Sequence, residues 1–112
     1  TLVRDTLEEI KAAGKIGVQA TEFAIFEPVI FDKGIVENIA ASSDELKLTS
    51  KLMTSGAGHD AQMINRIAPS AMIFVPSKDG VSHNPLEYTS PEQLVNGANV
   101  LLLTASKIVN AK

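Results

Sequence analysis

The sequence contains no cysteine, so disulfide bridges and thiolate metal sites are excluded at the outset. The same absence suits a reducing compartment, and we expect a cytoplasmic protein. Aromatic residues make up only 4% of the chain, so any core must be aliphatic. The longest apolar runs fall far short of the roughly 20 residues that span a bilayer, and no signal-peptide pattern opens the sequence. We therefore expect no contact with a membrane.

Positive charge is also scarce. The chain has 10 Lys and Arg against 13 Asp and Glu, a net charge of −3, and no basic cluster stands out. We therefore expect no nucleic-acid partner. Apolar residues, by contrast, make up 45% of the 112 residues, which is enough for a core and for one compact domain. The first residue is Thr1 rather than Met, which suggests a processed or truncated product.

Hydrophobic periodicity predicts several helices and strands. Asp32 and Ser90 are the expected N-caps of two of the helices, and Gln93 completes a capping box with Ser90. Asp60 stands where a third helix needs its cap. The helices are expected at 2–13, 32–46, 60–66 and 91–109, and the strands at 15–26, 50–54 and 71–75. In the last helix, the face expected to be buried carries Leu94, Ala98, Leu101, Ala105 and Ile108.

The order strand, glycine turn, helix, strand over residues 50–75 predicts a βαβ unit with a right-handed crossover. The expected fold class of residues 28–112 is therefore α/β, a small mostly parallel sheet with flanking helices. Residues 1–27 share no continuity with this unit, so we assign them to a separate layer. Their apolar side chains would lack partners and favour dimerisation, aggregation or crystal packing through this layer; they are Val3, Leu7, Ile16 and Phe23.

Only two histidines are present, and each follows a predicted strand. His59 follows 50–54 and His83 follows 71–75, so both imidazoles should meet at the carboxyl edge of the sheet. Glycines before His59 would adopt positive φ and let the backbone approach a ligand, and the following helix start could hold an anion. The plainer alternatives are solvated loop histidines and a simple helix cap at Asp60. Glu87 could orient the His83 imidazole or be a solvated acid.

The number of ligands limits a metal site. A catalytic metal centre needs about three protein ligands, and a two-metal site needs about five. The chain offers two histidines and Asp60, with no HExxH or His-x-Asp pattern. Glu8 and Glu9 are better explained as the solvated face of the first helix. Either the site is not metallic or further ligands come from elsewhere.

Two motifs carry a family resemblance. SGAGHDAQ (55–62) and SHNPLE (82–87), within a dense match over 50–103, resemble the C-terminal end of the hydantoinase/carbamoylase branch of the M20 metallopeptidase superfamily. That branch includes N-carbamoyl-L-amino-acid hydrolases, beta-ureidopropionases and allantoate amidohydrolases. Residues 1–49 match more loosely and resemble the end of the lid domain and the return to the catalytic domain. On this basis, residues 1–27 would be a lid remnant and 28–112 the C-terminal part of a catalytic domain.

The resemblance implies a hydrolase that uses two divalent metals (Zn, Mn or Co) to cleave the carbamoyl C–N bond of small ureido or N-carbamoyl amino acid substrates. It implies that His83 is a metal ligand. Substrate contacts are implied for Gly58, His59 and Gln62, and supporting roles for Asp60, Asn84 and Glu87.

The chain also departs from the family. The family's His-x-Asp and Glu-Glu ligand motifs lie upstream and are absent here, so no catalytic residue is assigned within these 112 residues. We expect about a quarter of such an enzyme, inactive by itself and binding metal weakly or not at all. Two alternatives stay open. One is a non-catalytic module that binds small anions or forms a subunit interface, and the other is a two-chain enzyme whose partner supplies the missing ligands.

Overall fold

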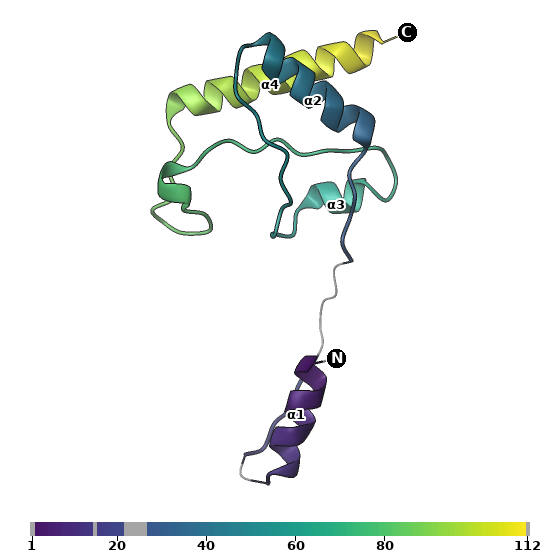
Figure 1. Cartoon of the computed structure of the whole chain (residues 1–112), viewed down its shortest axis with the longest axis vertical. Helices are drawn as coiled ribbons and strands as arrows, with labels where there is room; N and C mark the ends of the chain where they lie inside the picture. The colour runs from purple at the N-terminus through teal and green to yellow at the C-terminus, as the bar shows by residue number, and fades with distance from the viewer. Residues whose placement is uncertain (1, 15, 22–26, 112) are drawn as a thin grey trace.

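The computed structural model describes residues 2–14, 16–21 and 27–111. Two long helices lie against each other at one end of the molecule, and the N-terminal helix lies at the other (Figure 1). No helix of the described part is both long and apolar enough to cross a membrane. The helical elements are α1 (Leu2–Ala12), α2 (Lys33–Glu45), α3 (Asp60–Ile64), the 3₁₀ turn η1 (Lys78–Gly80) and α4 (Pro91–Asn110).

The predicted parallel sheet is wrong, because no strand forms anywhere in the described ranges. Segments 50–54 and 71–75 are non-helical, but neither belongs to a ladder. Of the predicted strand at 15–26, residues 16–21 are irregular, and residues 15 and 22–26 lie outside the described residues. Alternating apolar residues favour extended backbone, but a strand exists only where its N–H and C=O groups pair with a neighbouring strand.

One backbone hydrogen bond links the start of α2 to the residue that precedes segment 71–75. The N–H of Asp32 donates to the C=O of Ser70 at 3.0 Å. The side chain of Asp32 accepts from the N–H of Ile35 at 2.8 Å, which confirms the predicted N-cap of α2. This one residue therefore both starts α2 and ties it to the segment that leads into residues 71–75.

Helix α4 begins as predicted. Ser90 accepts from the N–H of Gln93 at 3.3 Å, and Pro91 occupies the first turn, where its missing N–H is no loss. The predicted buried face of this helix is wrong, however. Leu94 and Leu101 are 53% and 60% exposed, whereas Val100 and Thr104 are buried. The predicted face lines an open pocket, so its side chains stay largely exposed.

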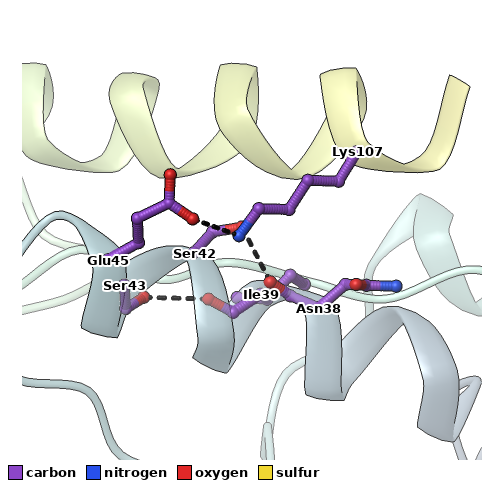
Figure 2. Close-up of polar contacts among 6 residues, drawn as sticks. All are labelled: Asn38, Ile39, Ser42, Ser43, Glu45 and Lys107. Atoms are coloured by element: carbon purple, nitrogen blue, oxygen red, sulfur yellow. Dashed lines mark hydrogen bonds and ion pairs between the residues drawn. The ribbon is translucent and has the colours of Figure 1, made fainter. Parts of the chain in front are cut away.

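Most of the buried side chains on α2 and α4 are small and polar. Ser42 and Ser43 are buried, and their hydroxyls donate to the carbonyls of Asn38 and Ile39 at 2.8 and 3.0 Å (Figure 2). The hydroxyl of Thr104, on α4, is buried without a hydrogen-bond partner. Short side chains let the two helix backbones approach closely, and internal hydrogen bonds remove most of the cost of burying hydroxyls.

An ion pair joins the same two helices. Lys107 Nζ of α4 lies 2.8 Å from Glu45 Oε2 of α2 (Figure 2). Both side chains are partly exposed, so the pair stabilises the contact by no more than about 1 kcal/mol. Packing, rather than charge, holds α2 and α4 together.

The chain is extended overall. Its Cα radius of gyration is 20.1 Å, whereas a compact domain of this length would have about 13 Å. Val3 and Ile16 are 70% and 67% exposed, Leu7 is half-buried, and Phe23 lies outside the described residues. Dimerisation through the N-terminal layer, and its origin as a lid remnant, stay predictions.

Candidate functional site

His59 is the N-cap of α3. Its Nδ1 accepts from the N–H of Ala61 at 3.0 Å, and its own N–H donates to Gln62 Oε1 at 3.0 Å. The prediction that Asp60 caps this helix is wrong, because Asp60 is already the first helical residue. A Gln three residues after the cap is the capping-box spacing, so HDAQ carried a signal for this arrangement.

The capping bond determines the chemistry that His59 can offer. A neutral imidazole whose Nδ1 accepts a hydrogen bond carries its proton on Nε2, so we assign His59 as an Nε2–H donor. The Gln62 carbonyl oxygen is likewise engaged, which leaves its NH₂ group to donate. His59 lines a pocket of about 460 Å³ formed by α2, α4 and the segment 71–75. The site at this end of the pocket therefore offers hydrogen-bond donors.

The start of α3 leaves few backbone donors for an anion. The N–H of Ala61 is bound to His59 Nδ1, and that of Gln62 donates to the C=O of His59 at 2.9 Å. The predicted positive φ at the glycines of this turn is also wrong, since the described glycines with positive φ are Gly14 and Gly80. These observations weigh against the anion-binding alternative.

We expect His59→Ala to remove about 1 kcal/mol of stability from α3, the usual cost of losing an N-cap side chain. Amide hydrogen exchange of Ala61 measures this directly, because its N–H is the capped donor. His59→Asn is the matched control, since Asn is a strong N-cap and should keep the amide protected. Equal exchange rates in the Ala and Asn variants would contradict the capping role.

His83 lies on the exposed loop 81–88 with φ of 55°, in the left-handed region. This conformation costs a residue with a β-carbon about 1–2 kcal/mol, so it must be held by its surroundings. Glu87 Oε2 accepts from the backbone N–H of His83 at 2.7 Å. Asn84 Oδ1 accepts from the N–H of Leu86 at 2.9 Å and closes the following turn. The loop therefore presents His83 from an ordered hydrogen-bonded turn.

Figure 1 places the start of α3 and the loop 81–88 on the same side of the extended segment that leads into η1, opposite α4. His59 belongs to the lining of the pocket beneath α4, whereas His83 does not. No hydrogen bond among the described residues joins the two imidazoles, so their convergence on one ligand stays a prediction.

The residues present fit a metal site only in part. An exposed imidazole is the commonest protein ligand for a transition metal, and no hydrogen bond of the described residues engages the His83 ring. However, the described ranges hold no group of three or more His, Cys, Asp or Glu side chains that could hold a metal ion. His83 could supply one ligand, and a complete centre would need ligands from outside these residues.

The fold matches that of a solved structure. The solved structure titled AtUAH in complex with glyoxylate superposes with a TM-score of 0.85 at 36% identity, covering 95% of this chain and 25% of that one. Residues 6–107 match Peptidase family M20/M25/M40. The chain belongs to this family, which confirms the resemblance drawn from its motifs.

Two curated relatives indicate which branch of this family the chain resembles. The ureidoglycolate hydrolase of Arabidopsis thaliana is 42% identical over 99 residues, which are 86% of this chain and 21% of that protein. The allantoate amidohydrolase of Bacillus subtilis is 45% identical over 87 residues, 76% of this chain and 21% of that protein. The chain therefore spans about a fifth of the length of the curated relatives it matches.

Proposed function

We propose that these 112 residues form one wall of a hydrolase site that cleaves a C–N bond in a small ureido or N-carbamoyl compound. The observation that carries the proposal is the presence of two histidine segments, 55–62 and 82–87, each with local hydrogen bonds. They occur in a chain that is similar to enzymes named for ureidoglycolate and allantoate. Each segment presents an exposed histidine: a hydrogen bond holds the ring of His59, and one to Glu87 holds the backbone of His83.

Each assigned residue has a distinct role in this proposal. His83 is a ligand to a divalent cation such as Zn, Mn or Co. His59 donates its Nε2–H to a carbonyl or carboxylate oxygen of the substrate, and Gln62 donates through its amide NH₂. The backbone at Gly58 lies next to the bound substrate. Asn84 supports the turn that follows His83, and Asp60 has a supporting role as the first residue of α3.

The rest of the site comes from polypeptide outside these residues. Two imidazoles cannot complete a centre that needs about three to five ligands. The exposed apolar side chains of α4, which include Leu94, Leu101 and Leu102, are further support, because neighbouring exposed apolar side chains mark surfaces that contact other polypeptide. The covering polypeptide belongs either to the same longer chain or to a separate subunit. A cytoplasmic location stays a prediction.

The proposal is tested with a chimera in which this chain replaces the matching portion of the A. thaliana ureidoglycolate hydrolase. We expect the purified 112-residue chain to show no hydrolysis of ureidoglycolate, allantoate or N-carbamoyl amino acids, because its ligand set is incomplete. We expect the chimera to hydrolyse at least one of these compounds and to retain bound metal. Ammonia release and elemental analysis provide the two measurements.

The unmodified plant enzyme, and a version truncated before the matching portion, are the controls. Turnover by the isolated chain would overturn the shared-site proposal. A folded chimera with no activity on any of the three substrates would contradict the assignment of this chain to C–N hydrolysis.

A further inference from the structure

We propose that Glu87 is a positioning residue for His83 and acts through the backbone rather than through the imidazole. This inference rests on the proposed role of His83 as a metal ligand. Glu87 Oε2 accepts the backbone N–H of His83 at 2.7 Å, and no hydrogen bond of the described residues joins this carboxylate to the imidazole. The carboxylate therefore controls where the ring is presented without competing for its nitrogens.

His83 needs such a contact because of its backbone. A φ of 55° brings its β-carbon close to its own carbonyl oxygen, a conformation that residues other than glycine adopt only when their surroundings hold them. In this conformation its N–H turns toward Glu87. The hydrogen bond to the Glu87 oxygen opposes relaxation of the backbone to a commoner conformation, because relaxation would leave this N–H without its acceptor.

The rest of the loop holds Glu87 itself in place. The N–H of Glu87 donates to the C=O of Asn84 at 2.9 Å, and the N–H of Leu86 donates to Asn84 Oδ1 at 2.9 Å. One residue further on, the C=O of Tyr88 accepts from the N–H of Lys78 at 2.7 Å and anchors the loop to η1. Glu87 is thus fixed at both its backbone and its carboxylate.

This arrangement differs from a carboxylate that hydrogen-bonds a metal-binding imidazole and raises its basicity. In that arrangement the negative charge matters, and a neutral amide is a poor substitute. In the backbone arrangement, an acceptor oxygen at the right distance is the essential feature. Glu87→Gln keeps such an oxygen and Glu87→Ala does not, so the two variants separate the two roles.

The first test uses the metal-free 112-residue chain and amide hydrogen exchange followed by NMR. We expect Glu87→Ala to speed exchange of the His83 amide about tenfold and Glu87→Gln to change it by less than about threefold, because only Ala removes the acceptor. Lys78→Ala, an exposed change that leaves the backbone bond of residue 78 intact, is the control. An unchanged His83 exchange rate in Glu87→Ala overturns the inference.

The second test uses the chimera. We expect Glu87→Ala to lower kcat/KM and metal retention about 10- to 100-fold and Glu87→Gln to restore most of both, as for residues that orient a metal ligand. Equal loss in the two variants would mean that Glu87 acts through its charge, which overturns the inference. If His83→Ala keeps metal and activity, the proposed function fails, while the exchange result still decides whether Glu87 holds the loop.

Discussion

Replacing His83 with alanine is expected to lower kcat/KM of the chimera by more than about 100-fold, beyond the range for residues that merely support a metal ligand. The reason is that, in the proposed function, the substitution removes a metal ligand outright instead of misplacing it. Bound metal should fall in parallel, as measured by elemental analysis of the purified protein. Added imidazole should restore part of the activity, because it can occupy the space of the missing ring.

His59→Ala in the same chimera is the matched comparison. It removes the other imidazole, which we assign to substrate binding, so kcat/KM should fall while the metal content is unchanged. Retention of metal in His83→Ala, or loss of metal in His59→Ala, would contradict the division of roles between the two histidines.

Gly97→Val is expected to destabilise the contact between α4 and the segment 71–75 by about 3 kcal/mol, the upper part of the range for overpacking a close contact. A β-carbon at position 97 would overlap Cγ1 of Val75. Val75 is β-branched and stiff at χ1, so it cannot easily turn aside. Urea denaturation of the 112-residue chain, followed by helical circular dichroism, measures the loss.

Two variants control this experiment. Ala98→Val makes a similar change at the next, exposed residue of α4 and should cost no more than about 0.7 kcal/mol, the difference in helix propensity. Gly97→Val combined with Val75→Ala should be less destabilised than the sum of the single variants, because the clashing methyl is gone. Additive losses would show that the clash is not the cause.

Local features were predictable. The caps at Asp32 and Ser90 were identified because an N-cap depends on hydrogen bonds within about three residues. The motifs at 55–62 and 82–87 placed the chain in its family for a similar reason, since their residue types are recognised without knowing any long-range contact. The cap of α3 was missed by one residue, because Asp is a commoner cap than the His59 that precedes it.

Long-range features were not predictable. The apolar pattern of 71–75 indicated an extended backbone, but pairing into a sheet needs a second strand with free N–H and C=O groups beside it. Helix α4 offered more than one face for burial, and tertiary packing decided that Val100 and Thr104, rather than Leu101, are buried. The contact between Glu87 and the backbone of His83 likewise depended on loop geometry that residue spacing does not specify.

The sequence by itself determined where the helices begin, which residues carry chemistry and which family the chain belongs to. Each of these depends on residue types and on bonds between near neighbours. Only the tertiary structure decided which surfaces are covered and that the segments 50–54 and 71–75 form no strand ladder within the described part of the chain. Burial and strand pairing each need two segments in contact. The residues of one segment do not specify which other segment will lie against it.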